Sequence, residues 1–155
     1  MTVLQTIQQA IQQAKQICIA NGQNLTPIRE EILSLMIAAQ QPLTAYELLD
    51  KYRESHKSGA QPPTIYRALN FLEDNGFIHR LNSTRQFVVC DHLGEHDTHT
   101  LTQFFICDQC GTIEETLMNH TILHAIQAKA QQLNFAIKQP NLEIHGLCAL
   151  CQTQS

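Results

Sequence analysis

The chain has 155 residues, of which 43% are hydrophobic and 15% are charged. This balance supports a packed core and argues against a disordered chain. No apolar run is long enough to cross a bilayer, and the first residues lack the charged and apolar regions of a signal peptide. We therefore expect a cytoplasmic protein without a membrane partner.

The formal net charge of −4 is unevenly distributed along the chain. Residues 1–90 contain eight Lys and Arg and seven Asp and Glu, whereas residues 91–155 contain two and seven. Because acidic surfaces repel phosphates, any contact with a nucleic acid is expected in the first part of the chain.

The first part begins with three predicted helices. Apolar residues recur at three- and four-residue steps over residues 4–18, with Gln at most other positions, which predicts an amphipathic helix. Thr26 and Pro27 are typical of an N-cap and a first helical residue, so a second helix should begin there. Thr44 and Glu47 have the spacing of a capping box and predict the start of a third helix.

A fourth helix and a hairpin are predicted to follow. The helix should begin at Pro62-Pro63 and end at Asn75-Gly76. Its inward face is predicted to consist of Ile65, Ala68, Leu69 and Leu72. Two apolar stretches, 77–81 and 86–90, flank turn-forming residues and predict a β-hairpin. Helices followed by a hairpin are typical of a winged helix-turn-helix.

After Cys90 the composition changes. Residues 91–100 are polar, acidic and rich in His, as expected of a hinge. Strands are predicted at 101–107 and 112–117, then a helix capped by Asn119. The apolar stripe of that helix is predicted to be Ile122, Ile126, Ala130 and Leu133. A last strand is expected near 135–138 or 142–145.

These elements predict an α+β fold with two domains. Residues 1–90 should form a winged-helix DNA-binding domain, and residues 91–100 the hinge. Residues 101–155 should form a small α/β dimerisation domain, because a core of this size usually needs a metal or a partner for stability.

Four of the six cysteines form two Cys-x-x-Cys pairs, namely Cys107, Cys110, Cys148 and Cys151. Cytosolic thiols are kept reduced, so a metal is a better explanation than disulfides. Two such pairs can complete a closed tetrahedral zinc site that joins the start of the second domain to its end.

A second set of candidate ligands lies on both sides of the hinge. Its members are His79, Cys90, His92, His96, His99, Glu114 and Glu115. A His and a Cys from the hairpin, a His from the hinge and a carboxylate beyond it would together bind a metal that fixes the angle between the domains. Solvated hinge histidines and a core cysteine are the alternative interpretation. Thiolate with imidazole favours zinc over the harder iron(II) or manganese(II).

Nearly the whole sequence resembles the ferric uptake regulator family, most closely its zinc uptake regulator branch. The segments that carry the resemblance are Leu25-Thr26-Pro27-Ile28-Arg29, Thr44-Ala45-Tyr46-Glu47-Leu48-Leu49, Pro62-Pro63-Thr64-Ile65-Tyr66-Arg67-Ala68-Leu69, Gly76-Phe77-Ile78-His79, Phe105-Ile106-Cys107-Asp108-Gln109-Cys110-Gly111 and His145-Gly146-Leu147-Cys148-Ala149-Leu150-Cys151. The resemblance implies a homodimeric repressor that binds operator DNA when loaded with zinc and represses zinc-uptake genes.

The resemblance also implies two zinc ions per chain. The structural zinc falls on Cys107, Cys110, Cys148 and Cys151, and the regulatory zinc on His79, Cys90, His99 and Glu115. The hinge run is His96-Asp97-Thr98-His99 where the family commonly has His-His-Asp-His. This departure leaves His96 or His92 as substitutes for His99, and Glu114 as a substitute for Glu115.

The fourth helix is expected to enter the major groove of DNA. The expected DNA contacts are Tyr46, Thr64, Tyr66 and Arg67. Arg67 can donate two hydrogen bonds to guanine O6 and N7. One dimer or two dimers per operator are both compatible with the sequence.

Three other functions are alternatives to this prediction. An iron-responsive or peroxide-sensing regulator would share the fold, but Cys90 favours zinc. A zinc-binding chaperone or storage module would not need a recognition helix. An enzyme is not expected, because the sequence contains no evident nucleophile–base pair or open catalytic zinc site.

Overall fold

The computed structural model describes residues 3–56, 59–93, 101–137 and 141–153. The chain divides into two compact units, Met1–Glu95 and His96–Ser155, which we call the N-terminal and C-terminal units. Their boundary lies in the segment predicted as a hinge, of which residues 94–100 are outside the described residues. Within the described residues, no helix is both long and apolar enough to span a membrane.

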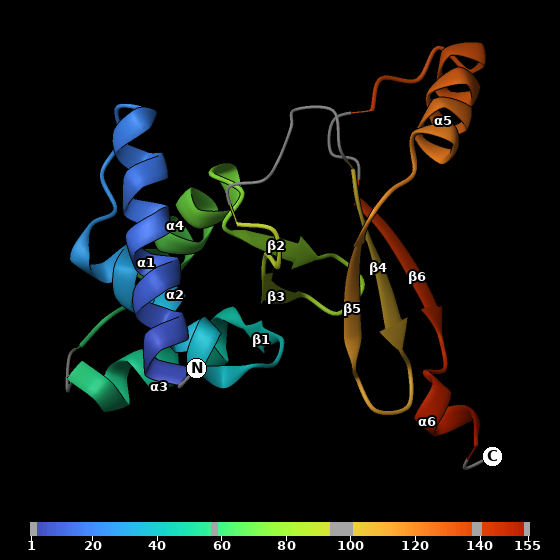
Figure 1. Cartoon of the computed structure of the whole chain (residues 1–155). Helices are drawn as coiled ribbons and strands as arrows, with labels where there is room; N and C mark the ends of the chain where they lie inside the picture. The colour runs from blue at the N-terminus through green and yellow to red at the C-terminus, as the bar shows by residue number, and fades with distance from the viewer. Residues whose placement is uncertain (1–2, 57–58, 94–100, 138–140, 154–155) are drawn as a thin grey trace. The chain divides into compact units, whose positions relative to one another are not determined.

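The N-terminal unit combines helices with a small sheet (Figure 1). Its helices are α1 (Val3–Ala20), α2 (Pro27–Ala39), α3 (Ala45–His56) and α4 (Pro62–Asp74). Its strands are β1 (Leu43–Thr44), β2 (Ile78–Leu81) and β3 (Gln86–Val89), antiparallel in the order β1-β3-β2. The winged helix-turn-helix prediction is therefore confirmed, with β1 as an unpredicted addition.

One apolar core holds the N-terminal unit together. Leu33 of α2, Leu48 of α3 and Leu69 of α4 are fully buried, as is Phe77 before the hairpin. The predicted inward face of α4 is buried in full. Because all four helices contribute to this core, α4 is held firmly with its other face toward solvent.

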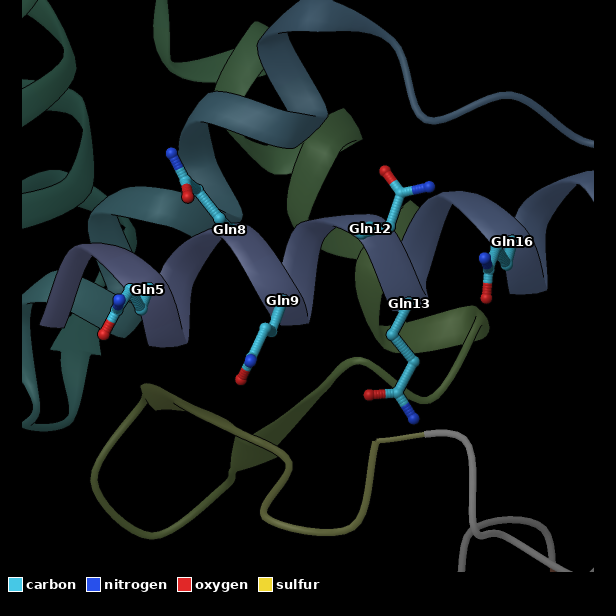
Figure 2. A pocket seen from close by; sticks show the side chains of 6 residues that line it. All are labelled: Gln5, Gln8, Gln9, Gln12, Gln13 and Gln16. Carbon is cyan, nitrogen blue, oxygen red and sulfur yellow. The ribbon is translucent and has the colours of Figure 1, made fainter. Parts of the chain in front are cut away.

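The outer face of α1 is lined by glutamines (Figure 2). These residues are Gln5, Gln8, Gln9, Gln12, Gln13 and Gln16. The opposite face packs into the core through Ile11, Ala14 and Cys18. The amphipathic pattern predicted for this helix is thereby confirmed, and Cys18 is a core residue.

The start of α3 is fixed by the predicted capping box. Glu47 Oε2 accepts hydrogen bonds from the Thr44 backbone N–H (2.7 Å) and from Thr44 Oγ1 (2.8 Å). The Glu47 backbone N–H donates in return to Thr44 Oγ1 (3.2 Å). The hydrogen bonds from Thr44 lower the pKa of Glu47 below its usual value of 4.5, and the bond from the Thr44 backbone has the largest effect.

We expect Glu47→Ala to destabilise the N-terminal unit by about 1 kcal/mol at neutral pH, because the capping bonds to Thr44 are lost. A lowered pKa means that ionised Glu47 stabilises the fold above its unfolded pKa, and that this contribution disappears as the pH falls through the folded pKa. Thermal melts followed by circular dichroism should therefore show a difference from wild type that shrinks in acid. Glu54→Ala, the same substitution at the other end of α3, is the control and should lower the melting temperature less, because Glu54 lies outside the capping box.

The described part of the C-terminal unit contains a second sheet and two helices. Its elements are β4 (Thr102–Cys107), β5 (Ile113–Leu117), α5 (His120–Gln132), β6 (Asn141–Gly146) and α6 (Ala149–Gln152). The strand order is β5-β4-β6, with β5 antiparallel and β6 parallel to β4. The predicted α+β fold class is confirmed. Of the two positions expected for the last strand, 142–145 is correct and residues 135–137 form no strand.

The apolar stripe predicted for α5 is at most half-buried in the described C-terminal unit. Leu123 is the only buried residue described in α5, whereas Ile122 is 45% exposed and Leu133, just after the helix, is 66% exposed. Figure 1 shows α5 beyond one end of the sheet and α6 at the other end. The periodicity was correct for a helix, but the described C-terminal unit does not bury this stripe.

Candidate metal centres and nucleic-acid interface

The sheet of the C-terminal unit brings the two Cys-x-x-Cys pairs together. Cys107 is the last residue of β4, and its register partner on the parallel strand β6 is Gly146. Parallel strands end at the same edge of a sheet, so the segment after β6 returns to the turn that holds Cys110. Cys148 is the N-cap of α6 and Cys151 lies within that helix.

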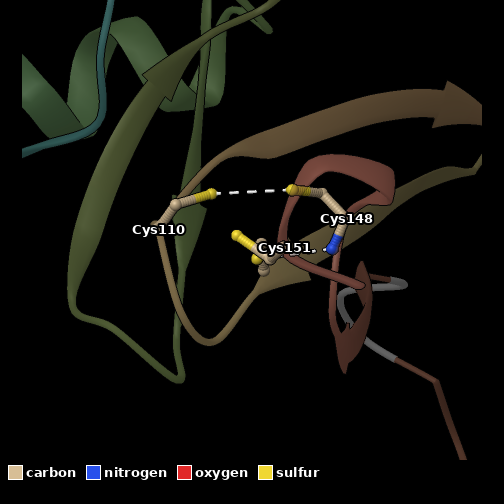
Figure 3. A group of neighbouring side chains, drawn as sticks. Cys110, Cys148 and Cys151 are labelled. Carbon is tan, nitrogen blue, oxygen red and sulfur yellow. Dashed lines mark hydrogen bonds between the residues drawn. The ribbon is translucent and has the colours of Figure 1, made fainter. Parts of the chain in front are cut away.

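The four sulfurs form a compact group in which all ligand atoms lie within 4.8 Å of one another. Cys110 Sγ and Cys148 Sγ are 3.7 Å apart and face each other across the gap between the two segments (Figure 3). A tetrahedral ion with Zn–S bonds of about 2.3 Å requires sulfur separations of about 3.8 Å. The geometry therefore fits a closed zinc site with four thiolates.

The surroundings of the thiols also fit a cation. The pKa of Cys107 is lowered to about 6, chiefly because the Cys148 backbone N–H donates to its sulfur. The Thr112 hydroxyl, 3.1 Å from Cys110 Sγ, lowers the pKa of that thiol as well. In contrast, hydrogen bonding to the Cys148 thiol and burial raise the pKa of Cys151 to about 12, and the Cys107 charge adds to this rise. Four thiolates so close together need a positive ion to neutralise their charge.

A contact between two side chains other than the cysteines links the two Cys-x-x-Cys segments. His145 Nδ1 lies 2.7 Å from Asp108 Oδ1, and the Asp108 backbone N–H donates to Gly146 O (2.9 Å). Asp108 lies between the first two cysteines and His145 precedes the second two. The sequence prediction did not include Asp108, because only the pairing of β4 with β6 brings it to His145.

The predicted regulatory ligands are divided between the two units. His79 on β2 and Cys90 just after β3 both belong to the N-terminal unit, and their ligand atoms lie within 4.8 Å of each other. Hairpin pairing explains this proximity, since His79 is opposite Val88 in the register and the Cys90 backbone N–H donates to Phe77 O (3.0 Å). The Cys90 side chain is 2% exposed.

The remaining candidate ligands lie elsewhere along the chain. His92 is half-buried in the turn after Cys90. Glu114 and Glu115 lie on β5 of the C-terminal unit and point to opposite faces of the sheet, beside Phe105 and Phe104 respectively. His96 and His99 lie outside the described residues.

The candidate DNA-contacting residues of the N-terminal unit are accessible. Thr64, Tyr66 and Arg67 are exposed on α4, opposite its buried face, and Tyr46 is 64% exposed at the start of α3. Helix α4 therefore exposes three of these residues to solvent, as a recognition helix must. The guanidinium group of Arg67 carries the hydrogen-bond donors that suit a guanine edge or a phosphate.

Comparison with known proteins relates this architecture to a family of regulators. The ferric uptake regulator family model matches residues 20–145. The zinc uptake regulation protein of Escherichia coli (strain K12) is 43% identical over 148 residues, which cover 94% of this chain and 83% of that protein. A solved structure of a zinc uptake regulator complexed with zinc and DNA is 40% identical with a TM-score of 0.86, covering 96% of this chain and 97% of the other. The crystal structure of holo XcZur is 39% identical with a TM-score of 0.81, and the match covers 92% of this chain and 96% of the other. The chain belongs to the ferric uptake regulator family.

Proposed function

We propose that this protein is a zinc-responsive transcriptional repressor that binds operator DNA as a zinc-loaded homodimer and represses zinc-uptake genes. The pair of His79 and Cys90, in the hairpin of β2 and β3 and directly after it, carries this proposal. These potential metal ligands lie in the same unit as α4, the proposed recognition helix. The similarity to a zinc uptake regulation protein and to a zinc uptake regulator complexed with zinc and DNA supports it. We infer that it acts in the cytoplasm.

Two zinc ions per chain are proposed, with different roles. Cys107, Cys110, Cys148 and Cys151 hold a structural zinc that stabilises the C-terminal unit. His79 and Cys90, with Glu115 and a hinge His, hold a regulatory zinc. His99 is the hinge ligand of first choice, with His96 and His92 as substitutes, and Glu114 is the substitute for Glu115. The thiolate of Cys90 is the reason for preferring zinc to iron(II) at this site.

The regulatory zinc is proposed to act by selecting one arrangement of the two units. A metal with ligands on both sides of a hinge binds only the arrangement that brings them together, so it raises the population of that arrangement. If this arrangement places two recognition helices at the spacing of two DNA half-sites, zinc raises the affinity for DNA.

The C-terminal unit is proposed to form the dimer. Its exposed apolar side chains include Leu117, Ile122, Leu133, Phe135 and Ile137. Side chains of this size rarely remain exposed together on a monomer, and a second copy offers the same surface in return. Analytical ultracentrifugation of the zinc-loaded protein tests this, since a monomer at micromolar concentration would refute the dimer.

Zinc stoichiometry tests the proposed sites. We expect about two zinc ions per chain in the loaded protein and about one after mild chelation, because a closed thiolate site releases zinc far more slowly than a hinge site. If only one zinc ever binds, the hinge ligands do not form a zinc site. Stronger binding of iron(II) than of zinc would instead favour an iron-responsive or peroxide-sensing regulator. Failure to bind any DNA with zinc present would favour a zinc-binding chaperone or storage module.

We expect Arg67→Ala to weaken binding to a selected DNA site by about 1–3 kcal/mol and to relax the base preference at one position of each half-site. Fluorescence anisotropy with selected and random duplexes measures both effects. Lys129→Ala removes the same charge from the C-terminal unit and should leave the base preference intact. An equal loss on both duplexes would mean that Arg67 contacts phosphate only.

A further inference from the structure

Asn70 lies on the exposed side of α4, one helical turn after Arg67. Its neighbours Ala68, Leu69 and Leu72 are buried, so the helix directs Asn70 away from the core. Residues three positions apart lie on the same side of a helix, and Asn70 therefore shares the surface from which Arg67 is proposed to reach DNA.

The Asn70 amide is held by an arginine from the hairpin of β2 and β3. Arg80 on β2 donates from Nη2 to Asn70 Oδ1 (3.0 Å). Arg80 is itself positioned by Glu73, whose Oε2 lies 3.3 Å from Arg80 Nε, and by the Phe87 ring, 5.0 Å from the guanidinium carbon. The contact thus joins the recognition helix to both strands of the hairpin.

This contact determines which end of the amide remains available. A guanidinium group only donates hydrogen bonds, so the Asn70 atom beside it must be the oxygen and not the nitrogen. The Nδ2 group is left with two N–H donors, and in the described part of the chain no residue accepts a hydrogen bond from it. Asn70 is therefore presented to the solvent as a donor.

We propose that Asn70 is a specificity-determining DNA contact and that Arg80 fixes the polarity with which it reads a base. In the major groove, guanine, adenine and thymine present acceptors, whereas cytosine presents only the N4 amino donor. A fixed Nδ2 donor therefore disfavours cytosine on the contacted strand, at a position next to the one read by Arg67. This inference rests on the proposed DNA-binding function and assigns Asn70 as a base-contacting residue and Arg80 as a positioning residue.

Selection from randomised DNA duplexes at saturating zinc tests the assignment. The wild-type protein should yield a motif with one position per half-site that excludes cytosine. Asn70→Ala should lower discrimination at that position by about fivefold or more while the rest of the motif is retained. Asn24→Ala, the same substitution at an exposed loop position, is the matched control and should leave the motif unchanged.

Two further variants separate the polarity of the contact from a general effect on folding. Asn70→Asp keeps the acceptor that Arg80 requires but replaces the outward donor with an acceptor, so cytosine should become enriched at that position. Arg80→Ala leaves the Asn70 amide free to rotate, and the exclusion of cytosine should be lost at that position alone.

The outcomes that overturn the inference are distinct from failure of the proposed function. If the wild-type protein selects a motif and Asn70→Ala or Asn70→Asp selects the same one, Asn70 does not read a base. If Arg80→Ala changes every position of the motif or none, Arg80 does not set the polarity of this contact. If the wild-type protein itself selects no motif with zinc present, the proposed function fails together with the inference.

Discussion

Cys148→Ala is expected to remove one zinc ion per chain and to unfold the C-terminal unit under conditions in which the wild type is folded. Cys148 connects the two Cys-x-x-Cys segments, because its sulfur lies 3.7 Å from Cys110 Sγ and its backbone N–H donates to Cys107 Sγ (3.4 Å). Structural zinc contributes about 10–16 kcal/mol of apparent binding free energy in small zinc modules, and three remaining ligands retain only part of it. Zinc analysis and limited proteolysis of the purified variant measure both effects.

The control for this substitution is Cys18→Ala. Cys18 is fully buried in the core of the N-terminal unit, where burial is the main cause that raises the pKa of its thiol. Cys18 belongs to neither proposed zinc site, so Cys18→Ala tests the effect of removing a cysteine that is not a ligand. This variant should keep its full zinc content. If Cys148→Ala also keeps the zinc and the protease resistance of the wild type, the four cysteines do not form a structural zinc site.

Cys90→Ala is expected to leave the structural zinc in place and to abolish the response of DNA binding to zinc. Coupling between two binding sites commonly amounts to about 1–3 kcal/mol, or about 5- to 150-fold in affinity, and this gain should disappear. DNA affinity measured with and without added zinc gives the gain directly. His79→Ala should have the same effect, because its ligand atom lies within 4.8 Å of that of Cys90.

Loss of the zinc-dependent increase in DNA affinity must be distinguished from unfolding, because Cys90 is buried and its substitution can also destabilise the N-terminal unit. Melting temperature and the tightly bound zinc of each variant provide this check, with Cys18→Ala again as the control for a buried cysteine. A Cys90→Ala protein that is folded and still binds DNA more tightly with zinc would exclude Cys90 from the regulatory site.

Local rules account for most of the fold that the sequence predicted. The start of α2 follows from Pro27 in its first turn, although the N-cap Thr26 makes no side-chain cap hydrogen bond. The start of α3 follows from the Thr44–Glu47 capping box, and each start depends on only a few neighbouring residues. The four cysteines could be grouped for a similar reason, since ligand spacing within each pair is local and zinc chemistry supplies the long-range link.

Elements that depend on distant partners were not predictable in the same way. Strand β1 has two residues and exists because Leu43 and Thr44 pair with β3. The last strand was ambiguous because residues 135–138, Phe-Ala-Ile-Lys, also form a short, largely apolar stretch. Pairing with β4 decides in favour of Asn141–Gly146.

The candidate sites show the same limit. Hairpin register brings Cys90 near His79, and the sequence supported that pair once the hairpin was predicted. The choice among hinge histidines depends on the path of the chain between two units and not on spacing. The contact of Arg80 with Asn70 was missed because it joins a helix to a strand ten residues later through side chains alone.

The dependence of DNA affinity on buffered free zinc tests the central claim most directly. A duplex selected by the wild-type protein, labelled for fluorescence anisotropy, would be titrated with protein over a range of free zinc and, separately, of iron(II). We predict that zinc raises the affinity by at least about tenfold, within the usual range of coupling between two sites, and that iron(II) at equal free concentration does not. An affinity that is independent of zinc, or that iron(II) raises equally, would contradict a zinc-responsive repressor.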